Sequence, residues 1–197
     1  MRRIDRTNHP TGNDVTSCPC GVTHSLVEEA WRCRITNVVE GLWVSGEPAL
    51  RGSATTHEGA TDMRVDLVIN LSEQRPEHAD DGQIEVVWIP AVDDGSRRTE
   101  GWFEDICSAA LDRNVLLQCH LGVARAPSAA YAVLLSRGLD ECSALELVMR
   151  QRPVATATYA SEAYEWFTQD RATPEQVSYL ELLRQRLIRE NRERLNS

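Results

Sequence analysis

The chain has 197 residues, and its 21 basic and 30 acidic side chains give a formal net charge of −9. All the basic residues are arginines, which excludes chemistries that depend on lysine, such as a Walker-type phosphate loop or a Schiff base. The acidic balance argues against nucleic acid as a partner. No run approaches the roughly 20 apolar residues of a membrane span, and the polar N-terminus lacks the apolar core of a signal peptide. We therefore expect a cytoplasmic protein with neither a nucleic-acid nor a membrane partner.

The first part of the chain is polar and rich in turn-forming residues. This composition indicates an N-terminal extension over residues 1–34, with a short helix around residues 25–31. The stretch over residues 35–44 is rich in β-branched residues and is interrupted by Glu40-Gly41. It predicts two strands that are joined by a hairpin turn.

Three short apolar runs follow, over residues 65–71, 84–89 and 115–119. Their length and β-branched content predict central strands that are buried on both faces. Apolar residues at helical spacing predict helices over residues 100–112, 127–137, 140–151, 161–168 and from Thr173 onward. This alternation indicates an α/β fold with a central, mostly parallel sheet flanked by helices. It also predicts a main domain over residues 35–168 and a C-terminal helix over residues 169–197, whose apolar stripe docks on the domain.

The segment around Cys119 has the pattern of an anion-binding site. A buried strand ends in Cys119, and Arg125 follows at the start of a helix. The loop between them consists of His120, Leu121, Gly122, Val123 and Ala124. Its backbone N–H groups can surround one tetrahedral oxyanion, and the helix dipole adds to the attraction. Gly122 permits a tight turn, and Arg125 offers a planar fork for two phosphate oxygens. The same positive surroundings favour the thiolate form of Cys119.

Cys119, Gly122 and Arg125 in this spacing resemble the signature of the cysteine-dependent protein tyrosine phosphatases, and their surroundings are similar to the dual-specificity branch. The resemblance covers roughly residues 35–168. Its motifs lie at residues 41–46, 65–71, 89–93, 151–153 and 161–167. It implies a fold like that of the dual-specificity phosphatases, with no metal and no organic cofactor.

The resemblance also implies an activity, which is the hydrolysis of phosphoric monoesters through a cysteinyl-phosphate intermediate. Cys119 would be the nucleophile, and Arg125 with the loop amides would bind the phosphate oxygens. Asp93 would donate a proton to the leaving oxygen and later activate water. Asp94 remains an alternative, because a shift of one residue in the alignment exchanges the two carboxylates.

Two residues depart from the family pattern. Gln118 precedes the nucleophile, where the family usually has histidine. Ala126 follows Arg125, where the family usually has a hydroxyl that helps the thiolate leave in the second step. Ser128 could take over part of this role. We therefore expect an active enzyme in which breakdown of the phosphoenzyme is slow.

The loop side chains carry no fixed positive charge, which favours a phosphorylated protein as substrate and partner over a highly phosphorylated lipid or inositol. A phosphoinositide or inositol phosphatase and a phosphate-binding pseudophosphatase remain alternatives. A sulfurtransferase of the rhodanese type or an arsenate reductase would also use a cysteine at an anion-binding loop, but neither gives Asp93 a role. The sequence leaves the oligomeric state open.

The N-terminal extension contains four residues that are able to bind a metal, namely Cys18, Cys20, His24 and Cys33. Their spacing matches no common zinc pattern, so we favour a disordered or docked extension over a zinc site. Cys107 falls on the apolar face of its predicted helix, which favours a core cysteine over a redox partner of Cys119.

Overall fold

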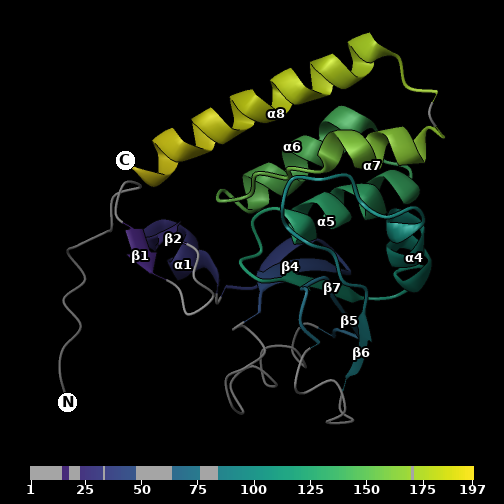
Figure 1. The fold of residues 1–197 in the computed structure, drawn as a ribbon, viewed down its shortest axis with the longest axis horizontal. Coiled ribbons are helices and arrows are strands. Elements are labelled where there is room, and N and C mark those ends of the chain that lie inside the picture. Colours follow the sequence, from purple (N-terminus) through teal and green to yellow (C-terminus); the bar gives the residue numbers. More distant parts are fainter. Residues whose placement is uncertain (1–14, 18–22, 33, 48–63, 76–83, 170) are drawn as a thin grey trace.

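The computed structural model describes residues 15–17, 23–32, 34–47, 64–75, 84–169 and 171–197. Within them, a five-stranded sheet has the strand order β3-β4-β7-β5-β6 (Figure 1). Its strands are β3 (Thr36–Val39), β4 (Leu42–Gly46), β5 (Leu67–Asn70), β6 (Glu85–Trp88) and β7 (Val115–Cys119). Strands β4, β7, β5 and β6 run parallel, and β3 pairs antiparallel with β4. The predicted mostly parallel sheet is confirmed.

The position of each strand in the sheet decides how deeply it is buried. Strands β5 and β7 lie inside the sheet, and all their residues are buried, as their apolar composition predicts. Strand β6 lies at the edge, where Glu85 is exposed and Trp88 keeps 39% of its surface. The prediction that this run is buried on both faces is therefore wrong, because the layers that cover the sheet are incomplete at its edge.

The hairpin between β3 and β4 turns at Glu40-Gly41, as predicted. Gly41 has φ +76°, in the left-handed region that glycine adopts without strain. The hairpin places β4 next to β7, and the two strands pair in parallel from Leu42 opposite Val115 to Gly46 opposite Cys119. Both strands therefore end at the same edge of the sheet.

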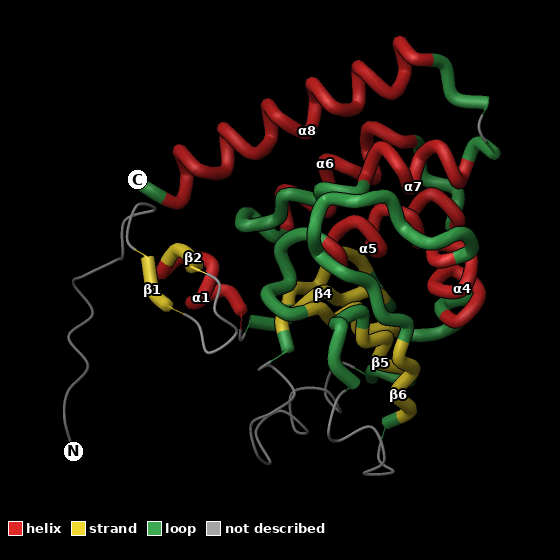
Figure 2. Tube along the Cα trace, viewed as in Figure 1, coloured by secondary structure: helices red, strands yellow, loops and turns green. Residues whose placement is uncertain are grey.

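Four helices lie on one side of the sheet (Figure 2). They are α4 (Trp102–Ala109), α5 (Arg125–Ser136), α6 (Glu141–Gln151) and α7 (Ala160–Phe167). Helix α5 is buried over nearly its whole length in the main hydrophobic core. The other face of the sheet carries a smaller apolar cluster, which contains Trp43, Val65, Val68 and Leu116. The four helices lie where the apolar spacing predicts them.

The C-terminal helix α8 (Pro174–Leu195) packs against α6 and α7. It begins with a capping box, in which Thr173 Oγ1 accepts from Gln176 N and Gln176 Oε1 accepts from Thr173 N. Leu180, Leu183 and Leu187 are buried in the main core, so the apolar stripe docks on the domain as predicted.

The described part of the N-terminal region contains a two-stranded pair, β1 (Val15–Ser17) with β2 (Thr23–Ser25), and helix α1 (Leu26–Arg32). The short helix was predicted, and the strand pair was not. Helix α1 contacts β4. The division of the chain at residues 34 and 168 remains a prediction. None of the described helices is both long enough and apolar enough to cross a membrane.

Candidate active site

The loop over residues 120–124, for which the sequence predicts phosphate binding and which we call the phosphate loop, lies where the central strand β7 passes into helix α5. Cys119 is the last residue of β7, and Arg125 is the first residue of α5. In open parallel sheets, ligands bind outside the carboxyl ends of the strands. The sheet therefore places the loop, the thiol and the guanidinium at the edge where binding sites of α/β proteins occur.

Every carbonyl of the phosphate loop accepts a hydrogen bond from the surrounding protein. Glu47 N donates to His120 O, and Arg152 donates to both Leu121 O and Gly122 O. Thr156 donates to Val123 O, and Ser128 donates to Ala124 O. In a planar trans peptide, the C=O and the following N–H point in opposite directions. Each N–H group of residues 121–125 therefore points away from the donor that binds the carbonyl before it. This arrangement, together with the N-terminus of α5, suits an anion.

Gly122 has the backbone that the sequence predicts for this loop, with φ +69°. A Cβ at this position would also lie 2.5 Å from Arg152 Nη2 and 2.6 Å from the Ser45 carbonyl carbon. Both the conformation and the close approach of β4 therefore require glycine.

Arg152 lies in the motif at residues 151–153, for which the sequence predicts no role in the site. Its side chain is fully buried and donates to five oxygens. Nε binds Gly122 O at 2.5 Å, Nη2 binds Leu121 O and Trp31 O, and Nη1 binds Arg34 O and Thr36 Oγ1. Burial lowers the pKa of Arg152 to about 10, so the guanidinium stays charged near neutral pH. Arg152 thus ties the phosphate loop to the segment after α1.

Cys119 is 1% exposed, and its Sγ accepts a hydrogen bond from Ala126 N at 3.4 Å. Two other described cysteines, Cys107 and Cys142, are free thiols in surroundings that disfavour the thiolate. Burial raises the pKa of Cys107 to about 11, and it raises the pKa of Cys142 as well. Both therefore stay protonated near neutral pH, and the prediction of Cys107 as a core cysteine agrees with its position on α4.

Arg125 is 3% exposed and lies beside the acid loop, which we define as residues 90–98. Its Nη1 donates to Leu71 O at 3.2 Å and to Ala91 O at 2.6 Å. Its Nε lies 3.4 Å from Asp93 Oδ2 but has no hydrogen-bond partner among the described residues. The guanidinium is thus fixed by two carbonyls, while one buried N–H remains open to an acceptor.

The two candidate acids differ in orientation. Asp93 faces Arg125, and its Oδ1 accepts from Tyr159 Oη at 2.7 Å. Asp94 turns away, because its Oδ1 accepts from the amide of Ser96 at 2.9 Å and from its hydroxyl at 2.6 Å. These hydrogen bonds lower the pKa of Asp94, which keeps it ionised and makes it a poor proton donor. The geometry thus favours Asp93. Tyr159 is a second neighbour of Asp93, and no sequence signal pointed to it.

Ser128 and Gln118 have structural partners. Ser128 Oγ donates to Ala124 O at 2.8 Å and accepts from Tyr159 N at 3.0 Å, so its proton is directed to the loop carbonyl and not to Cys119. Gln118 is 1% exposed, and its amide links strand ends. Nε2 donates to Gly46 O and Glu47 O, and Oε1 accepts from Asn70 Nδ2. Gln118 therefore holds β4 and β5 beside β7 without a titratable group.

His120 Nδ1 lies 3.0 Å from Glu47 Oε2, and Leu121 and Val123 are apolar. Among the residues that the structure describes, no group of three or more His, Cys, Asp or Glu side chains is able to hold a metal ion. Cys18, Cys20 and Cys33 lie outside the described residues, so the N-terminal zinc alternative stays untested.

Solved structures of phosphatases resemble this chain over most of its length. Human DUSP28 matches with a TM-score of 0.54 and 22% identity, over 78% of this chain and 94% of that one. A mouse putative dual specificity phosphatase, complexed with zinc tungstate, matches with a TM-score of 0.54 and 20% identity, over 80% of this chain and 91% of that one. The human tyrosine phosphatase-like serine/threonine/tyrosine-interacting protein matches with a TM-score of 0.59 and 12% identity, over 70% of this chain and 98% of that one. No family model and no curated protein matches the sequence.

These matches show the fold of the chain. The chain has the fold of a tyrosine phosphatase-like protein. Within that class, the chain has the fold of the dual-specificity phosphatases, as the sequence resemblance implied.

Proposed function

We propose that the chain hydrolyses phosphoric monoesters as a protein phosphatase of the dual-specificity type. The observation that carries the proposal is the buried Arg125 Nε, which has no hydrogen-bond partner among the described residues. A buried N–H without an acceptor is costly, and a phosphate oxygen would satisfy it. The mouse relative whose structure contains tungstate, a tetrahedral oxyanion, lends further support.

In the first step, the Cys119 thiolate attacks phosphorus as the bond between phosphorus and the ester oxygen breaks. Arg125 and the amides of residues 121–125 bind the nonbridging oxygens, where they stabilise the transition state by position and charge. Protonated Asp93 gives its proton to the leaving oxygen. The products are the free alcohol and a cysteinyl phosphate.

In the second step, ionised Asp93 accepts a proton from water as the water attacks phosphorus and the S–P bond breaks. This releases inorganic phosphate and the Cys119 thiolate. Among the described residues, Cys119 Sγ accepts a hydrogen bond from the Ala126 amide, but residue 126 has no hydroxyl and Ser128 donates to Ala124 O. We therefore infer that the second step is the slower one.

A singly phosphorylated protein side chain is the substrate class that we favour. The loop side chains carry no fixed positive charge, and Glu73 Oε1 lies 3.9 Å from Arg125 Nη1 on a side chain that is 54% exposed. This acidic neighbour repels additional phosphate groups. It therefore favours phosphotyrosine, phosphoserine or phosphothreonine over inositol phosphates. A screen that measures kcat/KM for both groups of substrates compares them directly.

The test of the proposed function is the turnover of para-nitrophenyl phosphate. We expect the wild-type chain to exceed Cys119→Ser by about 10⁴-fold or more, because the serine hydroxyl is a far weaker nucleophile. Intact mass spectrometry after acid quenching should detect one phosphoryl group on the wild-type chain during turnover. A wild-type rate equal to that of Cys119→Ser, with phosphate still bound, would instead establish a phosphate-binding module.

A matched pair of variants tests the proton donor. Asp93→Asn should lower kcat/KM by about 10²-fold or more for phenyl phosphate, whose leaving group needs protonation, and by less for para-nitrophenyl phosphate. Asp94→Asn should leave both values nearly unchanged, because its carboxylate is bound to Ser96. The reverse pattern would assign the acid to Asp94. No effect of either variant on a turning-over enzyme would favour a thiol chemistry without a general acid.

A further inference from the structure

Tyr159 makes a direct contact with the proposed acid. Its hydroxyl donates to Asp93 Oδ1 at 2.7 Å and accepts from Gly95 N at 3.3 Å. The residue is 3% exposed, and it precedes α7. Burial, and then the hydrogen bond to Asp93, raise the pKa of Tyr159 to about 12. The hydroxyl therefore keeps its proton and remains a donor at every pH at which the enzyme would work.

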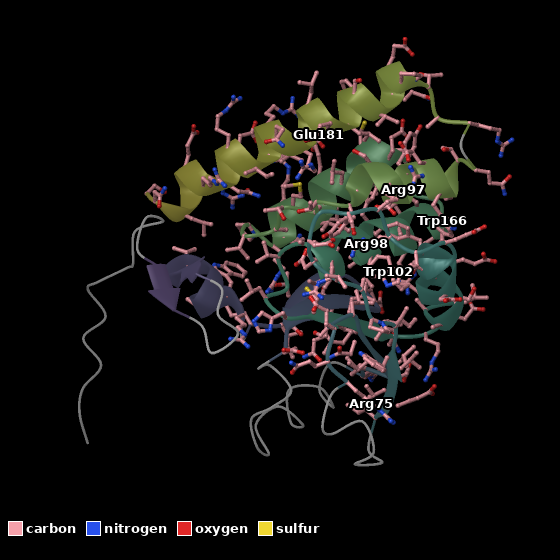
Figure 3. All side chains as sticks on the ribbon, in the orientation of Figure 1. Arg75, Arg97, Arg98, Trp102, Trp166 and Glu181 are labelled. Carbon is pink, nitrogen blue, oxygen red and sulfur yellow. The ribbon has the colours of Figure 1, made fainter. Side chains whose placement is uncertain are left out.

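The ring of Tyr159 is itself held in place by Arg98. The Arg98 guanidinium lies 3.9 Å from the centre of the ring, within the range of a cation–π contact. Arg98 is 8% exposed, and its side chain also donates to Val92 O and Ser96 O. These contacts fix the acid loop on both sides of Asp93. Figure 3 labels Arg98 among the side chains in the middle of the molecule.

Helix α7 supplies two more contacts to the same loop. Glu162 Oε1 accepts from Arg98 N at 2.5 Å, and Arg97 pairs with Glu165 at 3.0 Å. Figure 3 shows Arg97 beside this helix. The acid loop is thus attached to α7, which is far from Asp93 in the sequence. A loop held in this way presents Asp93 to the phosphate loop before any substrate binds.

We propose that Tyr159 is the positioning residue that orients Asp93 and determines which of its oxygens carries the reacting proton. The inference rests on the proposed function. Because the Tyr159 hydroxyl occupies Oδ1, the proton resides on Oδ2, which lies 3.4 Å from Arg125 Nε. When a phosphate oxygen takes the Arg125 N–H, Oδ2 lies next to the bound ester and donates its proton to the leaving oxygen.

The experiment is a double-mutant cycle that combines Tyr159→Phe with Asp93→Asn and uses two substrates. Tyr159→Phe keeps the ring and removes the hydroxyl, so the Arg98 contact survives. It should lower kcat/KM for phenyl phosphate about tenfold or more and that for para-nitrophenyl phosphate far less. In the Asp93→Asn background, Tyr159→Phe should have little effect on kcat/KM, because the carboxyl group that Tyr159 orients is already absent.

Tyr131→Phe is the matched control. Tyr131 is also buried, in α5, and its hydroxyl has no hydrogen-bond partner in the described part of the chain. Its removal should leave both kcat/KM values unchanged. Circular dichroism and thermal unfolding of each variant verify that the fold is intact.

The possible outcomes separate this inference from the proposed function. Equal losses on both substrates, or a Tyr159→Phe effect that persists in full in the Asp93→Asn background, would overturn the positioning role while the phosphatase stands. A Tyr159→Phe variant with an unchanged kcat/KM for phenyl phosphate would overturn the positioning role as well. A wild-type chain no faster than Cys119→Ser removes the proposed function, and the inference with it.

Discussion

Arg125→Lys should lower kcat/KM for para-nitrophenyl phosphate by about 10³-fold or more, although it keeps the positive charge. Arg125 uses its Nη1 to bind Leu71 O and Ala91 O, which leaves Nε free for the ligand. A lysine has its three donors on one atom and cannot serve two carbonyls and two phosphate oxygens at the same time. Steady-state kinetics over a range of substrate concentrations measure the effect.

Arg137→Lys is the control for this substitution. Arg137 follows the other end of α5, and its Nη2 donates to Arg113 O at the surface. The same chemical change there should leave kcat/KM unchanged. If Arg125→Lys loses less than about tenfold, the planar fork is not required and charge alone accounts for binding.

Arg152→Met should lower the free energy of unfolding by about 3–5 kcal/mol. The substitution removes a donor from five buried or part-buried oxygens, two of them in the phosphate loop, although Trp31 O keeps Arg34 N as a second donor. Each buried acceptor that loses its partner costs about 1–3 kcal/mol, and the apolar side chain recovers part of the total. Urea titration followed by tryptophan fluorescence measures the change.

Arg150→Met provides a matched comparison two residues away. The Arg150 side chain is 54% exposed and pairs with Glu146 at 3.4 Å. Loss of such a surface pair should change the free energy of unfolding by less than about 1 kcal/mol. A similar small loss for Arg152→Met would mean that the loop carbonyls do not depend on this arginine.

Much of the architecture was predictable, because the relevant signals are local. The hairpin at Gly41, the strand ending in Cys119 and the cap of α8 at Thr173 each follow from a few neighbouring residues. The edge position of β6 was not predictable, because an apolar run has the same composition whether it lies inside the sheet or at its edge.

The partners of the site residues depended on contacts between distant segments. Arg152 follows α6, where an arginine usually interacts with solvent and the helix dipole, and its burial arises only when β3, α1 and the phosphate loop converge. Tyr159 lies 66 residues from Asp93 in the sequence. Ser128 looked like a substitute for the missing hydroxyl at residue 126, but its rotamer directs the proton to Ala124 O.

The fold class and the loop pattern of Cys119, Gly122 and Arg125 follow from the sequence alone, because backbone propensity and a short loop are local properties. The orientation of the loop amides depends on folding, because the loop carbonyls bind donors from distant segments, namely Glu47 after β4 and Arg152 and Thr156 after α6. Folding also places Asp93 beside Tyr159 and Asp94 beside Ser96, because adjacent carboxylates differ only in the neighbours that folding brings to them.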